Sequence, residues 1–133
     1  MINSKKFLKG KNKLTKEELL TSHVESSKME WKPLIEEGIK TEGIFVKSLR
    51  YDKVVKRSPV ILLKFEPGAK YPAHNHPAGE EVFVLEGEVK FGNKNLSKGD
   101  YLYTPPNGKH AVWSKKGCTM LLIIPEEVEI LKA

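Results

Sequence analysis

Cysteine is nearly absent from this chain of 133 residues, and so are long hydrophobic runs. The single cysteine, Cys118, excludes an internal disulfide and indicates a reducing compartment. No stretch approaches the ~18 consecutive apolar residues of a membrane-spanning helix. The N-terminal residues carry positive charge, but they lack the apolar segment of a secretory signal. We therefore expect a soluble, cytoplasmic protein with no membrane partner.

Motifs that combine basic and aromatic residues for base stacking are also missing, although the net charge is +6. Residues 1–28 hold seven lysines against three glutamates, which leaves only +2 for residues 29–133. A basic arm of this kind can contact phosphate or acidic lipid, but a solvated tail is the simpler interpretation. Nucleic acid is therefore not an expected partner.

The chain divides at about residue 28 into this arm and one domain. In the arm, Thr15 and Glu18 form a potential capping box, which predicts a short helix over about 15–25 with His23 on its surface. Residues 29–133 show short β-rich runs separated by Gly, Pro and Asn, which predicts an all-β antiparallel sandwich or barrel. The expected strands are 43–51, 58–66, 80–91, 100–104, 110–114 and 118–125.

The run 80–85 is apolar on both faces, because Val82 and Val84 alternate with Phe83 and Leu85. Strands of this composition are normally covered on both sides. Inside a barrel, Val82 and Val84 would face the lumen, and the other face would need a cover. The N-terminal segment and a second subunit are both possible covers, so a homodimer is one expectation. Cys118 begins another apolar run and is interpreted as a buried small hydrophobic residue.

A group of potential metal ligands lies in the segment Tyr71 to Gly87, "YPAHNHPAGEEVFVLEG". His74 and His76 lie on the same face of an extended segment, so both imidazoles can reach one ion. Glu80 and Glu81 follow, and only one of them can point to that face. The turn in "TPPNGKH" would return His110 to the same region. Each histidine alone is more often an ordinary turn or edge residue.

Two motifs in these segments resemble those of the cupin superfamily. Gly68, His74, His76, Glu80 and Gly87 match the pattern G-x5-H-x-H-x3-E-x6-G. The second pattern, G-x5-P-x-G-x2-H, is matched by Gly99, Pro105 and His110, with Asn107 in place of its second glycine and Ser114 in place of a final asparagine. Asparagine tolerates a left-handed backbone nearly as well as glycine does, so the first departure is mild.

The resemblance extends from about residue 29 to about residue 125 and is strongest to the ChrR-like cupins, through "MEWKPL", "GEEVFVLEGEV", "GDYLYTPPNGKHAVWS" and "GCTMLLI". It implies a small jelly-roll β-barrel, often dimeric, that holds one divalent metal ion. The ligands carried over from the family are His74, His76, Glu80 and His110. Zinc or iron is expected, and manganese, nickel, cobalt and copper also accept this ligand set.

Two functions are the main candidates for such a site, and a third, sugar epimerisation, has no support in the sequence. One is a metal-dependent dioxygenase acting on a small diketone or phenolic compound bound in the barrel. The other is a non-catalytic zinc-binding sensor or ligand-binding module, which a closed set of four protein ligands favours. Tyr71, Tyr101, Tyr103 and Trp113 are candidates to line the ligand pocket, although barrel packing explains aromatic residues equally well.

Overall fold

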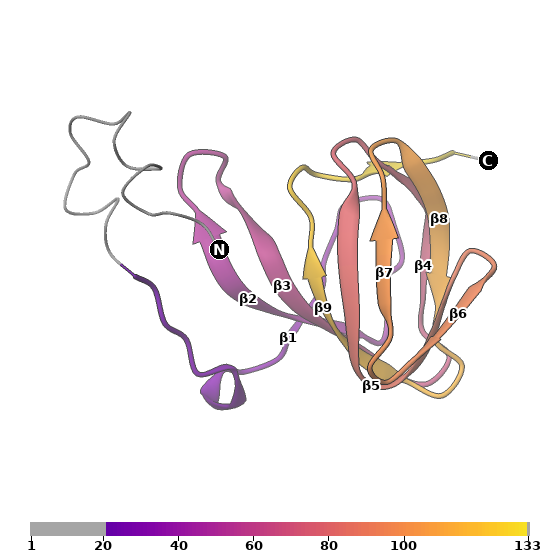
Figure 1. Cartoon of the computed structure of the whole chain (residues 1–133), viewed down its shortest axis with the longest axis horizontal. Coiled ribbons are helices and arrows are strands. Elements are labelled where there is room, and N and C mark those ends of the chain that lie inside the picture. The colour runs from indigo at the N-terminus through magenta and orange to yellow at the C-terminus, as the bar shows by residue number, and fades with distance from the viewer. Residues whose placement is uncertain (1–20, 133) are drawn as a thin grey trace, which may run out of the picture.

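The computed structural model describes residues 21–132, and these form a curled antiparallel β-barrel (Figure 1). One sheet contains β1 (Lys32–Pro33), β2 (Ile44–Asp52), β3 (Arg57–Phe65), β9 (Cys118–Ile123) and β7 (Tyr101–Thr104). The other contains β10 (Glu129–Ile130), β4 (Lys70–His76), β8 (Gly108–Trp113) and β6 (Lys94–Ser97). The long strand β5 (Glu80–Phe91) belongs to both sheets.

Strand β5 changes sheets at Gly87. Its first half pairs with β7 and β9, and its second half pairs with β6 and β8. The register with β9 shifts between Val84 and Glu86, and Gly87 then takes a φ of +79°. A Cβ atom on Gly87 would lie 2.1 Å from the carbonyl oxygen of Gly117. The bend therefore requires glycine, for both its backbone conformation and the close approach of a neighbouring strand.

The core fills the space between the two sheets. Val82 and Val84 from β5 and Met120 from β9 are almost completely buried there. Cys118 is buried in the same core, as the sequence indicates, and burial raises the pKa of its thiol. The alternation of buried and exposed residues along β9 follows the two-residue period of a strand with one face in the core.

The outer face of the first sheet is covered unevenly by the described residues. The N-terminal segment lies over β2 and β3, where Lys47 Nζ donates to the Ser26 carbonyl at 2.7 Å and lies 4.6 Å from the Trp31 ring. Phe83 and Leu85 are 40% and 36% exposed within residues 21–132. The described N-terminal segment therefore covers β2 and β3 but leaves Phe83 and Leu85 of β5 exposed, and the homodimer stays a prediction.

Several sequence expectations differ from the structure in detail. The expected helix lies mostly outside the described residues, and residues 21–25 have no regular secondary structure. A short 3₁₀ turn at Ser26–Lys28 follows instead. The strands β1, β4, β6 and β10 were not among the expected strands, although β4 contains the segment predicted to be extended. Within the described range, no helix has the length and apolar character to cross a membrane.

Candidate metal centre

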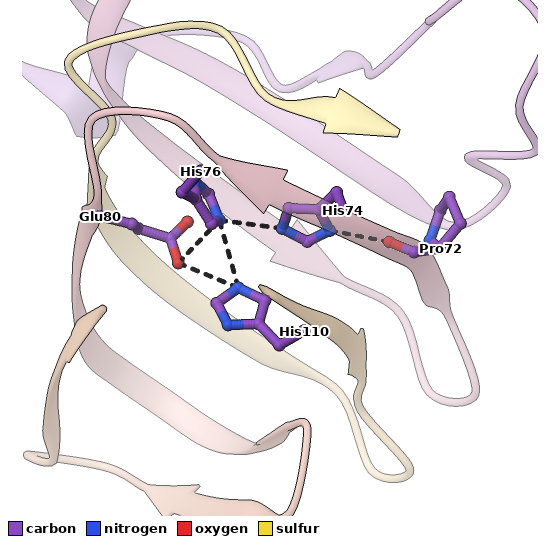
Figure 2. A network of polar contacts seen from close by, with 5 residues as sticks. All are labelled: Pro72, His74, His76, Glu80 and His110. Atoms are coloured by element: carbon purple, nitrogen blue, oxygen red, sulfur yellow. Dashed lines mark hydrogen bonds and ion pairs between the residues drawn. The ribbon is translucent and has the colours of Figure 1, made fainter. Parts of the chain in front are cut away.

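Three histidines and one glutamate converge at one end of the barrel (Figure 2). His74 and His76 lie on β4, and His110 lies on the neighbouring strand β8. The strand register places His74 directly opposite His110. The two-residue period of β4 then brings His76 to the same face as His74. The site is therefore formed by the pairing of two strands that are distant in sequence.

The ligand atoms of these side chains lie close together. The Nε2 atom of His76 is 2.9 Å from Nε2 of His74 and 3.2 Å from Nε2 of His110. The carboxylate Oε1 of Glu80 is 3.3 Å from Nε2 of His76 and 3.3 Å from Nε2 of His110. All three imidazoles therefore direct the same nitrogen at one point, and Glu80 approaches from one side of that point.

Local contacts hold His74 in the tautomer that a metal ligand requires. Its Nδ1–H donates to the Pro72 carbonyl at 2.7 Å, so its Nε2 carries a free lone pair. The Tyr71 ring contacts the same imidazole edge to face, with ring centroids 5.0 Å apart. Burial lowers the pKa of His74 to about 4 and that of His76 to about 3, so both are neutral near pH 7.

The two adjacent glutamates point to opposite sides of β5. Glu80 is buried beside the histidines, and burial raises the pKa of its carboxyl group. Glu81 is paired with Tyr103 on the other face and accepts a hydrogen bond from the Tyr101 hydroxyl. The register thus places Glu80 beside the histidines, as the six-residue spacing to Gly87 predicts.

The four side chains fit a divalent metal ion. Neighbouring ligands ~2.1 Å from one ion lie roughly 3–3.4 Å apart, which matches the four short distances at this site. The Oε1 atom of Glu80 is buried and has no hydrogen-bond donor among the described residues. Lone pairs that face one another across such distances repel unless a proton or a cation lies between them. One ion held by three neutral histidines and one carboxylate would carry a net charge of +1.

A cavity of about 210 Å³ lies beside these residues inside the barrel. Its walls are mainly apolar and include Ile61, Leu63, Phe65, Phe91, Met120 and Leu122. Residues 124–131, the C-terminal strap, cross the end of the barrel from β9 to β4 (Figure 1) and supply Glu127 and Val128 to the wall. The strap is attached by Glu129, whose carboxylate accepts a hydrogen bond from Asn75 at 2.6 Å.

A model of the ChrR cupin-like domain matches residues 21–124, which is most of the chain. The protein belongs to the ChrR cupin-like family. This membership confirms the resemblance seen in the sequence, and the fold is that of a cupin.

Solved structures with the same fold share little sequence with this family member. A putative acetylacetone dioxygenase from Methylibium petroleiphilum has a TM-score of 0.76 and 18% identity, covering 90% of this chain and 86% of the other. An acetylacetone dioxygenase from Acinetobacter johnsonii has a TM-score of 0.75 and 12% identity, covering 91% and 85%. The polyketide cyclase RemF from Streptomyces resistomycificus has a TM-score of 0.68 and 16% identity, covering 86% and 87%. Identities this low establish the shared fold alone.

One curated relative also matches this ChrR cupin-like chain. The DNA damage-repair/toleration protein DRT102 of Arabidopsis thaliana is 33% identical over 67 residues. The match covers 45% of this chain but only 22% of the plant protein. The chain therefore spans about a fifth of that relative, and the activity of the plant protein is not transferred to it.

The cupin motif positions have clear structural roles. Asn107, which replaces a motif glycine, has a φ of +67° and so adopts the left-handed backbone predicted for it. Its N–H donates to the His76 carbonyl at 2.7 Å, which fixes the turn before β8 against the end of β4. Ser114, at the position of the final asparagine, is fully buried and donates to the Glu88 carbonyl.

The pocket of this cupin differs from the sequence expectation in its aromatic residues. Tyr71 lines the cavity, but Tyr101, Tyr103 and Trp113 are on the outer surface, with exposures of 56%, 58% and 42%. These three side chains fall on the outward face of strands whose other face is buried. Val82 and Val84 are buried in the core and do not line this cavity. Four features of the site were not predicted from the sequence: the Pro72 carbonyl that orients His74, and Glu36, Arg57 and the strap at the cavity.

Tyr71 connects the histidine cluster to the loop before β2. Its hydroxyl donates to Glu36 Oε2 at 2.8 Å. Burial, followed by this hydrogen bond, raises the pKa of the Tyr71 phenol well above its usual range. The phenol therefore remains a hydrogen-bond donor at all physiological pH values, and Glu36 is held at the edge of the cavity.

Proposed function

We propose that this protein is a metal-dependent enzyme of the dioxygenase type that acts on a small oxygenated compound, such as a diketone or a phenol. The observation that carries the proposal is the convergence of three histidine Nε2 atoms and one buried carboxylate at the wall of an apolar cavity. The fold similarity to acetylacetone dioxygenases supports the same reaction class. His74, His76, Glu80 and His110 are the proposed ligands of zinc or iron.

The residues of the chain contribute binding and orientation to this chemistry. A bound ion such as iron(II) would supply Lewis acidity and a site for an oxygen donor of the substrate. The apolar walls would hold the carbon skeleton and limit water around it. The Pro72 carbonyl and the Tyr71 ring would keep His74 oriented, which preserves the ligand geometry.

A second candidate is a non-catalytic zinc module that senses or binds a ligand. It is favoured by one feature of the site, the presence of four protein donors within reach of one ion. Zinc with four protein ligands is usually structural, whereas catalytic zinc usually has three protein ligands and one open position. In this case the metal would stabilise the barrel, and the module would respond to the binding of a ligand in the cavity.

The decisive experiment separates these candidates in two steps. The protein is first purified without added metal, and its ion is identified by elemental analysis. The metal-free protein is then loaded anaerobically with iron(II), and O2 uptake is followed with diketones, catechols and hydroxyketones. Substrate-dependent uptake by wild type and Glu81→Gln, and its loss in His110→Ala, would support the enzyme. Tightly bound native zinc without substrate-dependent uptake would leave the binding module.

A further inference from the structure

Arg57 is the one permanent cation among the described residues that line the barrel cavity. It shares one face of β3 with the cavity residues Ile61 and Leu63, as the two-residue period of a strand requires. Its Nη1 donates to the Ile124 carbonyl at 2.6 Å, where the C-terminal strap begins. This contact holds the guanidinium at the cavity instead of letting it extend into solvent.

The guanidinium retains most of its hydrogen-bonding capacity. An arginine side chain has five N–H donors, and the contact with Ile124 uses one nitrogen. Across residues 21–132, no carboxylate lies within ion-pair distance of Arg57. The residue is half-buried, so its charge is only partly hydrated. A planar cation of this kind binds a carboxylate group in a fork-like geometry.

Arg57 and the histidine cluster lie at the same end of the barrel. Glu81 on β5 is paired with Ile123 on β9, and Ile123 is paired with Val60 on β3. The strands that carry Glu80 and Arg57 are therefore two strand spacings apart, or about 10 Å, and Arg57 lies two residues, or about 7 Å, beyond the level of Glu80 along β3. Both side chains line the cavity, so one short ligand can contact the metal centre and the guanidinium together. At about 210 Å³, the cavity is smaller than the roughly 300–1,000 Å³ of common ligand pockets.

Two carboxylates at the cavity edge limit the charge of such a ligand. Glu36 accepts the hydrogen bond from Tyr71, and Glu127 lies on the exposed strap. Both would repel a second negative charge in the cavity. The remaining wall is mainly apolar and favours a carbon skeleton between the two ends of the ligand.

We propose that the cavity binds a small monoanion with a carboxylate at Arg57 and a neutral oxygen donor at the opposite end, of which a short keto acid is the simplest case. This inference rests on the proposed function, because the oxygen donor would bind at the centre formed by the three histidines and Glu80. Arg57 is then the residue that selects keto acids over neutral diketones of the same shape.

The test compares two probes of matched shape, levulinate and acetonylacetone. Levulinate has a carboxylate at the position where acetonylacetone has an acetyl group. Binding to the zinc-loaded and metal-free proteins is measured by titration calorimetry after the zinc content has been determined. Wild type should bind levulinate about 10- to 100-fold more tightly than acetonylacetone, the range of a charge-assisted hydrogen bond. Arg57→Gln should lose this preference but keep its affinity for acetonylacetone, which shows that the cavity is intact.

Arg50→Gln is the matched control, because Arg50 is exposed on β2 and does not line the cavity. It should retain the preference for levulinate. Equal binding of the two probes by wild type would overturn the inference, and this result does not depend on whether Arg57→Gln folds. A preference that persists in Arg57→Gln would place the carboxylate at the metal and would also overturn it. A protein that binds neither zinc nor iron(II) would instead refute the proposed function.

Discussion

Replacing Glu80 by glutamine should weaken metal binding and stabilise the metal-free protein. Glu80 is 3% exposed, and its Oε1 faces two imidazole nitrogens at 3.3 Å. Glutamine has nearly the same shape, but it lacks the negative charge that attracts a metal ion. We expect metal affinity to fall about 10-fold or more, which corresponds to about 1.4 kcal/mol or more of binding free energy.

The metal-free protein should respond in the opposite direction. Without metal, the buried Oε1 atom of Glu80 has no hydrogen-bond donor among the described residues, and an unsatisfied buried atom of this kind costs about 1–3 kcal/mol. The amide of glutamine can donate to the free lone pair of His76 or His110 instead. A gain of about 1 kcal/mol would raise the melting temperature by roughly 3–5 °C in a chain of this length.

Glu81→Gln is the control for both measurements, because Glu81 lies on the opposite face of β5. Zinc affinity is measured by competition with a chromogenic chelator, and melting is followed by circular dichroism in the metal-free state. Glu81→Gln should leave zinc affinity unchanged. The reasoning is refuted if Glu80→Gln binds zinc as tightly as wild type, or if Glu81→Gln is the variant that loses zinc.

Three further predictions concern the three histidines of the site and the exposed face of β5. His110→Ala should lose most of its metal by elemental analysis, because it removes one of the four proposed ligands; full occupancy would remove His110 from the site. The metal-free protein should lose stability as the pH falls from about 6.5 to about 4, because the unfolded chain takes up protons that the buried His74 and His76 resist. The raised pKa of Glu80 opposes this loss, but it belongs to one group against two, and a urea midpoint that does not fall over this range would contradict the prediction. Phe83→Arg should convert the expected homodimer to a monomer by light scattering with unchanged metal content, and a monomeric wild type would contradict the dimer.

Much of the fold could be predicted from periodicity and turn residues. The run 80–91 coincides with β5, and 118–125 contains β9, because alternating apolar residues bounded by glycine are a strong strand signal. Strand β6 was missed because its sequence, Lys-Asn-Leu-Ser, has one apolar residue and resembles the turn beside it. Strand β10 is only two residues long and depends on tertiary contact with β4.

The candidate site was predictable where the signal is local spacing. His74, His76 and Glu80 lie within seven residues, and the motif glycines identified the neighbouring turns. Arg57 could not be predicted as a cavity residue, because only the pairing of β3 with β9 brings it to the barrel end. The Pro72 carbonyl is a backbone group, which side-chain motifs do not reveal. These contributions depend on tertiary register rather than on residue type.

The direct pairing of His74 with His110 also has a consequence for the kinetics of folding. In the unfolded chain, His74 and His76 are two residues apart, but His110 is distant in sequence and joins them only when β4 and β8 have paired. Pairing of distant strands is slow, because chain entropy is lost before the contacts form. Zinc added during refolding should therefore leave the folding rate nearly unchanged and should mainly slow unfolding. The metal would therefore bind after the rate-limiting pairing of the strands and would stabilise a barrel that has already formed.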